Sequence, residues 1–212
     1  MNKIIFITGG ARSGKSIFAE RLAVEFYCKL NIANKIAYVA TAVRTDPEFE
    51  ERIKLHQERR GDDFITYEEP LEIGVQFEKI FNKHQIFILE CLPTWLGNIY
   101  FTEKERKDKT IKADISNVLS LFSGKFDTSG NNQVEEIITD LKLGRIKKNN
   151  FFDVKESDKV LIVISNEVGM GLVPEDAVNR EFRDDLGNIN KRVSAVSDHS
   201  FLCVAGNILM LK

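Results

Sequence analysis

Short runs of consecutive apolar residues recur along the chain, separated by longer stretches with helical periodicity. Most of these runs are rich in β-branched residues and are apolar at successive positions rather than at alternate ones. Continuous apolar runs are typical of strands buried on both faces, as in a parallel sheet covered by helices. The pattern predicts an α/β fold with a mostly parallel sheet and helices on both faces. The predicted strands are Ile4–Thr8, Ile36–Ala40, Ile86–Glu90, Val160–Ser165 and Phe201–Ala205.

The stretch after the first apolar run has the period of an amphipathic helix. From Ser16 onwards, apolar residues recur at every fourth position, at Phe18, Leu22, Phe26 and Leu30. This spacing places the apolar side chains in one stripe that can pack against a core. A helix is therefore predicted over residues 16–30, directly after a glycine-rich segment.

The segment from Thr102 to Ser157 differs from the rest of the chain. It is rich in Lys, Glu, Asp and Asn and contains the turn-forming stretch "SGKFDTSGNNQ". Apolar residues recur with helical spacing on either side of that stretch, over Ile111–Phe122 and Val134–Leu141. We interpret residues 102–157 as a helical excursion from the sheet, with a linker as the alternative.

Length and composition fit one domain over residues 1–212. The chain is 43% hydrophobic and 29% charged, and a chain of 212 residues can bury a substantial core. Its 30 basic and 32 acidic residues give a net charge of -2, which argues against nucleic acid or an anionic membrane as the main partner. Any recognition of an anion must therefore be local.

Cysteine usage and hydropathy indicate a cytoplasmic protein. Cys28, Cys91 and Cys203 lie far apart and have no CxxC spacing, which argues against a disulfide framework or a zinc site. The N-terminal apolar run is too short for a signal peptide, and no window approaches the ~20 apolar residues of a membrane span. We expect a reduced, soluble, cytoplasmic chain with no membrane span.

The stretch "GGARSGKS" fits the phosphate-binding pattern G-x-x-x-x-G-K-[ST] and lies between a predicted strand and a predicted helix. Glycines let the backbone turn its N–H groups towards phosphate oxygens, and the helix N-terminus adds a positive partial charge. Lys15 can then reach the β and γ oxygens as a catalytic residue, which makes the predicted fold P-loop NTPase-like. A glycine-rich turn with an incidental lysine is the alternative. The predicted nucleotide-binding residues here are Gly9, Gly10, Ala11, Arg12, Ser13, Gly14, Lys15 and Ser16.

A P-loop also needs an acidic group near its metal ion, usually at the end of a neighbouring strand. Glu90 closes the apolar strand of "IFILECL" and is predicted at the carboxyl edge of the sheet, where ligands of open α/β sheets bind. We therefore predict Ser16 and Glu90 as ligands of Mg2+. The alternative is a strand-end carboxylate that only faces solvent, since aspartate is the commoner residue in this role.

A second helix is predicted in "DPEFEERIKLHQERR", because Asp46 can act as its N-cap and Pro47 suits its first position. On that helix, His56 lies one turn from both Arg52 and Arg60. Nearby positive charge disfavours the imidazolium form and leaves a neutral ring with a free lone pair, which would suit a nucleophile. The alternative is an ordinary helix surface on which His56 has no chemical role.

Three further features allow more than one interpretation. Asn166 and Glu167 follow the fourth predicted strand and precede two glycines, as in a loop that closes over a ligand or in an ordinary surface turn. Arg180 and Arg183 belong either to a solvated helix face or to a phosphate contact. Trp95 is expected to pack in the core rather than to stack on a ligand.

Together these stretches resemble the bifunctional adenosylcobinamide kinase / adenosylcobinamide-phosphate guanylyltransferase family of cobalamin nucleotide-loop assembly. The resemblance rests on "TGGARSGKS", "AYVATA", "RIKLHQERR" with the following "TYEEP", "ECLPTWLGN", and "SNEVGMGLVPED" with "REFRD". It covers about residues 1–100 and 158–212, with the motifs in order.

The resemblance implies two reactions. ATP or GTP phosphorylates adenosylcobinamide, and GTP then transfers GMP to the adenosylcobinamide phosphate through a guanylyl-histidine, which gives adenosylcobinamide-GDP. The resemblance also implies Mg2+ as the metal cofactor and a homotrimer in which neighbouring subunits complete the sites.

The same resemblance assigns residues to the two reactions. The nucleophilic histidine of the family falls on His56, and its phosphate loop falls on residues 9–16. The implied guanine-nucleotide contacts are Ala40, Thr41, Ala42, Gln57, Glu58, Arg59, Arg60, Glu68 and Glu90. Two departures are that Gly61 replaces a proline, which should loosen the helix end, and that Pro93 replaces a threonine, which removes a hydroxyl.

Two other functions compete with this one. The first is a monofunctional P-loop kinase acting on a small alcohol, in which the helix with His56 is only structural. The second is a GTP-dependent switch that binds a partner protein. Such switches usually recognise guanine with an Asn-Lys-x-Asp stretch, and "NKIA" at Asn34 lacks the aspartate. The bifunctional transferase is therefore the favoured prediction.

Overall fold

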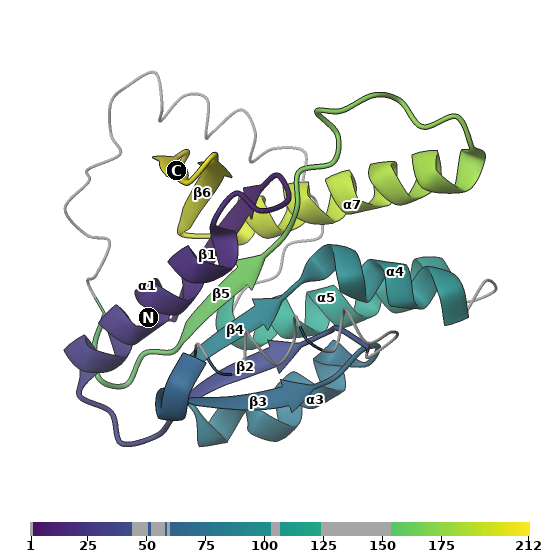
Figure 1. Ribbon diagram of the computed structural model, residues 1–212. Helices are drawn as coiled ribbons and strands as arrows, with labels where there is room; N and C mark the ends of the chain where they lie inside the picture. The colour runs from purple at the N-terminus through teal and green to yellow at the C-terminus, as the bar shows by residue number, and fades with distance from the viewer. Residues whose placement is uncertain (1, 44–50, 52–57, 59, 103–106, 124–153) are drawn as a thin grey trace.

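The computed structural model of the protein describes residues 2–43, 51, 58, 60–102, 107–123 and 154–212. Within them, one seven-stranded sheet has the order β3-β2-β4-β5-β1-β6-β7 (Figure 1). The strands are β1 Lys3–Gly9, β2 Ile36–Ala40, β3 Phe64–Glu68, β4 Ile86–Glu90, β5 Val160–Ile164, β6 His199–Val204 and β7 Asn207–Met210. All neighbouring pairs are parallel except β6 and β7, which confirms the prediction of a mostly parallel sheet.

The five predicted strands are all present, with ends within two residues of the predicted ones. The sequence analysis missed the two edge strands, β3 and β7. Both lack a continuous buried run, because the side chains of β3 are half-buried or exposed and those of β7 are all exposed.

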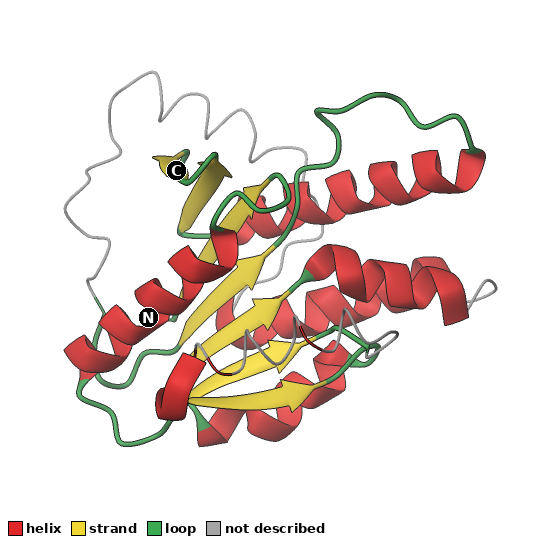
Figure 2. Ribbon diagram, in the orientation of Figure 1, coloured by secondary structure: helices red, strands yellow, loops and turns green. Residues whose placement is uncertain are grey.

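Helices cover both faces of the sheet, as predicted (Figure 2). Among the described helices, α1 packs on one face, and α3, α4, α5 and α7 pack on the other. Their bounds are α1 Lys15–Leu30, α3 Ile73–Ile80, α4 Leu92–Thr102, α5 Lys107–Ser123 and α7 Ala177–Val196, and two short 3-10 turns are η1 Gly61–Asp63 and η2 Phe81–Lys83.

The apolar runs are continuous because successive residues of a central strand enter two different cores. In β1, Ile5 and Ile7 face the core shared with α1, whereas Ile4 and Phe6 face the core beneath the other helices. Side chains alternate across a strand, so a strand covered on both sides needs apolar residues at every position. The predicted helix at residues 16–30 is confirmed as α1, whose Phe26 is fully buried.

The predicted helix at Ile111–Phe122 is confirmed as part of α5. Ile111, Ile115, Val118, Leu119 and Phe122 are buried, and the ring of Phe122 lies 6.1 Å from that of Phe77 in α3. This half of the helical excursion therefore belongs to the main core. The second predicted helix, Val134–Leu141, lies outside the described residues.

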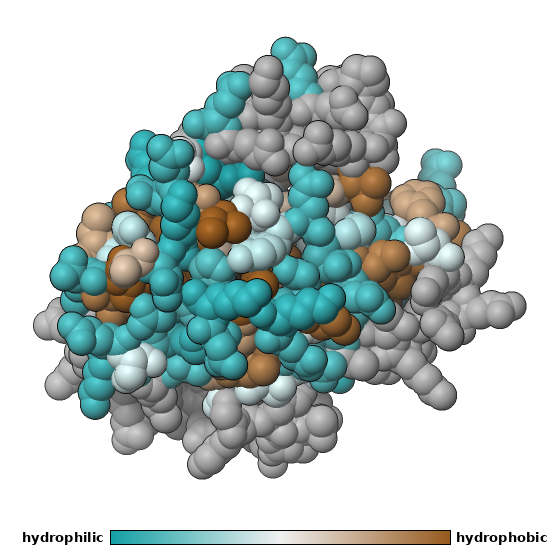
Figure 3. Space-filling view, turned by 90° about the horizontal axis from the view of Figure 1, so that it is seen from below, coloured by the Kyte–Doolittle hydropathy of each residue, from teal (hydrophilic) through white to brown (hydrophobic). Residues whose placement is uncertain are grey.

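Trp95 packs in this core, as predicted. It is fully buried, and its indole N–H donates to the carbonyl oxygen of Leu71 at 2.8 Å. The described part of the face drawn in Figure 3 is mainly hydrophilic, with small separate hydrophobic patches. No helix among the described residues is long and apolar enough to cross a membrane.

The contact between α3 and α5 places a carboxyl group in a half-buried position. An added Cβ at Gly74 of α3 would lie 2.7 Å from Oδ1 of Asp114, so the two helices approach closely at this point. Burial raises the pKa of Asp114 to about 6, and the negative charges of Glu72 and Glu69 add to this effect. The folded protein therefore binds a proton at Asp114 more tightly than the unfolded chain does.

We predict that Asp114→Asn stabilises the protein at pH 8 but has little effect near pH 4.5. As pH rises from the unfolded pKa of about 3.9 to the folded pKa of about 6, the folded state binds more protons than the unfolded one and loses stability. Asparagine avoids this loss, which we put at about 1 kcal/mol for a half-buried group, or about 2–4 °C in Tm. Thermal unfolding at both pH values measures the difference, and an equal shift at both would contradict the prediction.

Candidate functional site

The loop between β1 and α1 has the backbone that its glycines predict. Gly9 has φ +146°, and an added Cβ would lie 2.2 Å from the carbonyl oxygen of Cys203 in β6. Gly14 has φ +96° and forms the N-cap of α1. Gly206, in the turn after β6, donates its N–H to the carbonyl oxygen of Ser13 at 3.2 Å. The hairpin of β6 and β7 therefore packs against the phosphate loop.

The start of α1 is built for an anion. Neither a side-chain cap nor an acidic residue occupies its first turn, which begins with Lys15. The Lys15 amine donates to the carbonyl oxygen of Gly10 at 2.6 Å, so the side chain folds over the loop. Burial lowers the pKa of Lys15. Free N–H groups at a helix N-terminus together with a lysine are the elements of a phosphate site.

Glu90 lies beside this loop rather than only facing solvent. The Ser16 hydroxyl donates to Oε1 of Glu90 at 2.5 Å, and the Tyr38 hydroxyl donates to Oε2. A hydroxyl and a carboxylate are oxygen donors that Mg2+ prefers, and Mg2+ usually takes few protein ligands because phosphates and waters supply the rest. No cluster of three metal-ligating side chains occurs in the described part of the chain. Ser16 and Glu90 fit the metal ion that the sequence predicts.

The sequence analysis missed Tyr38, which lies in β2 and is 3% exposed. Burial raises the pKa of Tyr38 well above its usual range, and the charge of Glu90 adds to this effect. The hydroxyl therefore stays protonated and donates to the carboxylate. One signal was available in the sequence, because a tyrosine inside an apolar strand needs a partner for its hydroxyl.

Arg60 was predicted as a nucleotide contact. In the structure its guanidinium contacts other side chains of the protein. Its Cζ lies 3.7 Å from the centroid of the Tyr38 ring, and Nη2 donates to Oγ1 of Thr66 at 3.2 Å. The side chain is buried. Glu58 is exposed, and His56, Gln57 and Arg59 lie outside the described residues.

The other predicted nucleotide contacts lie at the carboxyl ends of neighbouring strands. In the register of the sheet, Ala40 of β2 pairs with Glu68 of β3 on one side and with Glu90 of β4 on the other. Ala42 is half-buried just beyond β2, and Glu68 is exposed. The structure therefore brings these residues to the edge where the phosphate loop also lies.

Thr41 is fully buried and joins β2 to β4. Its hydroxyl donates to the carbonyl oxygen of Cys91 and accepts from the Cys91 N–H, both at 2.9 Å. The Asn98 amide of α4 donates to the carbonyl oxygens of Thr41 at 2.7 Å and Pro70 at 3.0 Å. These bonds hold three chain segments together at the carboxyl edge, beside Glu90.

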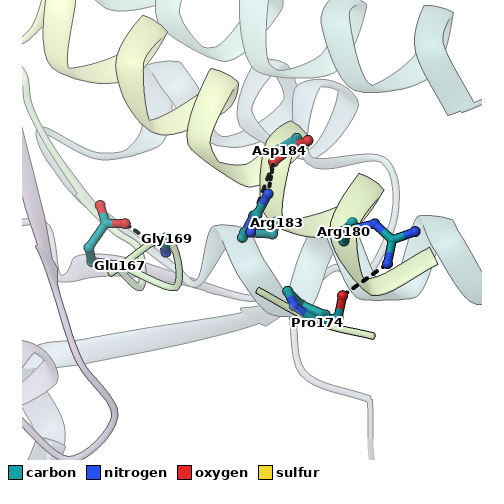
Figure 4. Close-up of polar contacts among 6 residues, drawn as sticks. All are labelled: Glu167, Gly169, Pro174, Arg180, Arg183 and Asp184. Carbon is teal, nitrogen blue, oxygen red and sulfur yellow. Dashed lines mark hydrogen bonds and ion pairs between the residues drawn. The ribbon is translucent and has the colours of Figure 1, made fainter. Parts of the chain in front are cut away.

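The loop between β5 and α7 begins at the phosphate loop. The N–H of Glu167 donates to the carbonyl oxygen of Gly9 at 3.2 Å. The Glu167 carboxylate accepts the N–H of Gly169 at 2.9 Å (Figure 4). Met170 and Leu172 follow and are 79% and 96% exposed. The loop thus begins beside the phosphate loop and carries exposed apolar side chains further along the chain.

The far end of the loop is held by the start of α7. Arg180 donates to the carbonyl oxygen of Pro174 at 3.0 Å, and Arg183 pairs with Asp184 at 2.9 Å (Figure 4). Arg180 also donates to the carbonyl oxygen of Glu175 at 2.6 Å. Asp176 caps the helix by accepting the N–H of Asn179 at 2.7 Å. Both arginines therefore have local partners.

Comparisons with known proteins point to one family. Residues 5–211 match the family described as "Cobinamide kinase / cobinamide phosphate guanyltransferase". The chain is 28% identical over 203 residues to the "Bifunctional adenosylcobalamin biosynthesis protein CobU" of Escherichia coli (strain K12), and the match covers 96% of each chain. It is 26% identical over 206 residues to the "Bifunctional adenosylcobalamin biosynthesis protein CobP" of Pseudomonas aeruginosa, with coverage of 97% of this chain and 95% of that protein.

Similarity to solved structures is weaker. The flagellar accessory protein FlaH from Methanocaldococcus jannaschii matches with a TM-score of 0.43 and 15% identity, over 99% of this chain and 78% of that one. The family assignment therefore comes from the sequence matches.

We predict that Gly9→Ala destabilises the protein by more than about 2 kcal/mol, because the new methyl group would overlap the carbonyl oxygen of Cys203 at an unfavourable φ. Urea denaturation measures the loss. Gly187→Ala in α7 is the matched control, since no atom lies within 4 Å of its added Cβ, and alanine stabilises a helix interior by about 0.5–1 kcal/mol. Unchanged stability of Gly9→Ala would contradict the close approach of the loop and β6.

Proposed function

The chain belongs to the cobinamide kinase / cobinamide phosphate guanyltransferase family, and we propose that residues 9–16 and Glu90 serve its kinase reaction while His56 serves its guanylyl transfer. The protein is a kinase and a nucleotidyltransferase of cobalamin biosynthesis. The family match favours two reactions over the monofunctional kinase. The observation that supports the kinase assignment is the contact between Ser16 and Glu90 beside the phosphate loop.

In the kinase reaction, the hydroxyl of the aminopropanol arm of adenosylcobinamide accepts the γ-phosphoryl group of ATP or GTP. Lys15 and the N–H groups of the loop neutralise charge on the phosphates, in a reaction that depends mainly on positioning and electrostatics. Ser16 and Glu90 would hold Mg2+, which would supply positive charge to the phosphates of the bound nucleotide.

In the second reaction, the neutral imidazole of His56 attacks the α-phosphorus of GTP. A phosphorus–nitrogen bond forms, the bond to the β-phosphate oxygen breaks, and pyrophosphate leaves. A phosphate oxygen of the phosphorylated corrinoid then attacks the same phosphorus, which releases His56 and gives adenosylcobinamide-GDP. A covalent intermediate divides one difficult transfer into two easier ones.

Residues on both sides of Glu90 are proposed to bind the guanine nucleotide. Ala40, Ala42 and Glu68 support this assignment because they lie at the same carboxyl edge as the phosphate loop. Thr41 contributes by fixing the backbone there. Gln57, Glu58 and Arg59 are assigned from their places next to His56 in the sequence. We also propose a cytoplasmic homotrimer, on the family resemblance.

We predict that wild-type protein incubated with GTP and Mg2+ gains the mass of one GMP, whereas His56→Ala does not. Because the kinase groups lie on a different segment, His56→Ala should retain most of the phosphorylation of adenosylcobinamide. Intact-protein mass spectrometry and a kinase assay with γ-labelled nucleotide measure the two outcomes. Label from α-labelled GTP on the His56→Ala protein would show that another residue is the nucleophile.

Lys15→Ala is expected to lose most of the phosphorylation of adenosylcobinamide, which His56→Ala should retain. Removal of one preorganised charge at the transferring phosphoryl group should lower the kinase kcat by ~10²–10³-fold. For His56→Ala, the matched control is His84→Gln. We expect it to leave both reactions unchanged, because His84 bonds to Tyr67 and to the carbonyl oxygen of Lys35. An unchanged kinase kcat in Lys15→Ala would contradict the assignment of the loop.

A further inference from the structure

The Glu90 carboxylate is held by a different hydroxyl at each of its two oxygens. Oε1 accepts from Ser16 of the phosphate loop at 2.5 Å, and Oε2 accepts from Tyr38 of the neighbouring strand. Tyr38 is 3% exposed, so its hydroxyl reaches the carboxylate from inside the protein, through the core shared with α1. One oxygen thus faces the loop and the other is anchored from within the fold.

The Tyr38 ring is in turn fixed by Arg60. The guanidinium carbon lies 3.7 Å from the ring centroid, which is the distance of a close cation–π contact. The guanidinium also donates to Thr66 of the edge strand β3 at 3.2 Å, and the arginine is buried. Thr66, Arg60, Tyr38, Glu90 and Ser16 therefore form a continuous chain of contacts from the sheet edge to the phosphate loop.

A glutamate in this place needs such support. Its extra methylene gives the carboxylate more rotamers than an aspartate would have, and ordering them costs conformational entropy. Outer hydrogen bonds to a metal-ligating carboxylate orient it, and their loss typically weakens metal binding by 10–100-fold. A tyrosine hydroxyl that donates to an ionised carboxylate makes a strong, charge-assisted hydrogen bond.

We propose that Tyr38 is a positioning residue that aims Glu90 at the metal ion of the kinase site, and that Arg60 holds the Tyr38 ring in place for this purpose. The proposal rests on the proposed function of Ser16 and Glu90 as Mg2+ ligands. Arg60 would then orient Glu90 through Tyr38 and would not contact the nucleotide. Arg60 follows His56 by four residues in the sequence.

The test compares Tyr38→Phe with Tyr67→Phe and Glu90→Gln. Tyr38→Phe keeps the ring under Arg60 and removes only the hydroxyl, and Tyr67→Phe removes a hydroxyl that bonds to His84 at 2.8 Å, away from Glu90. The probe is Mn2+, titrated by electron paramagnetic resonance into protein saturated with the α,β-methylene analogue of GTP, which cannot transfer GMP. Affinity for the same analogue in EDTA is measured separately.

We expect Tyr38→Phe to lower the affinity for Mn2+ about tenfold and to change the affinity for the analogue in EDTA by less than twofold. Tyr67→Phe should match wild type in both. If Glu90→Gln loses Mn2+ but Tyr38→Phe binds it as wild type does, the role of Tyr38 is wrong and the metal site stands. If Glu90→Gln also binds Mn2+ as wild type does, the proposed metal role of Glu90 and the role of Tyr38 both fail.

A kinase assay distinguishes positioning from a general loss of structure. In Tyr38→Phe, excess Mg2+ should restore the kcat towards that of wild type, whereas it should not restore the kcat of Lys15→Ala. Arg60→Lys keeps the charge but loses the planar group over the ring, and should show a smaller loss of Mn2+ affinity in the same direction. If Tyr38→Phe proves unstable, Arg60→Lys decides the question, and an unchanged Mn2+ affinity in it would overturn the role of Arg60.

Discussion

The lateral register of the parallel strands is the constraint on which the candidate site depends. Glu90 pairs with Ala40 on one side and with Ile164 on the other, and Ile164 pairs with Ile7, two residues before the phosphate loop. A slip of one residue in any pair would turn a strand's side chains to the opposite face. Glu90 would then point away from Ser16. The two buried cores, which accept different side chains from each strand, prevent that slip.

Much of the fold follows from the sequence because central strands must be apolar at every position. That requirement predicts all five inner strands, including β6 next to the edge, while α1 and α5 follow from apolar residues at helical spacing. The edge strand β3 escaped prediction because its side chains are only partly buried. The edge strand β7 escaped prediction because its side chains are all exposed, and the strand is defined only by its backbone pairing with β6. The local pattern of apolar residues indicates which strands are buried, whereas an edge strand depends on pairing with a strand elsewhere in the chain.

The parts of the site that are continuous in sequence could be predicted, whereas the parts that depend on where a side chain points could not. The phosphate loop is continuous in sequence, so its glycines, Lys15 and Ser16 could be found from one motif. Helical spacing placed Arg60 near His56, but spacing cannot tell which way a long side chain turns, and Arg60 lies over Tyr38. The partnership of Tyr38 with Glu90 joins residues 52 positions apart and needed the structure.

The support of the phosphate loop by the C-terminal hairpin affects the order in which the protein can be assembled. β1 lies between β5 and β6, and the loop after it contacts Cys203 and Gly206. The "GGARSGKS" motif precedes both of these strands in the sequence, so it is translated before β5 and β6. The loop can therefore gain its contacts with Cys203 and Gly206 only after these later residues have been synthesised.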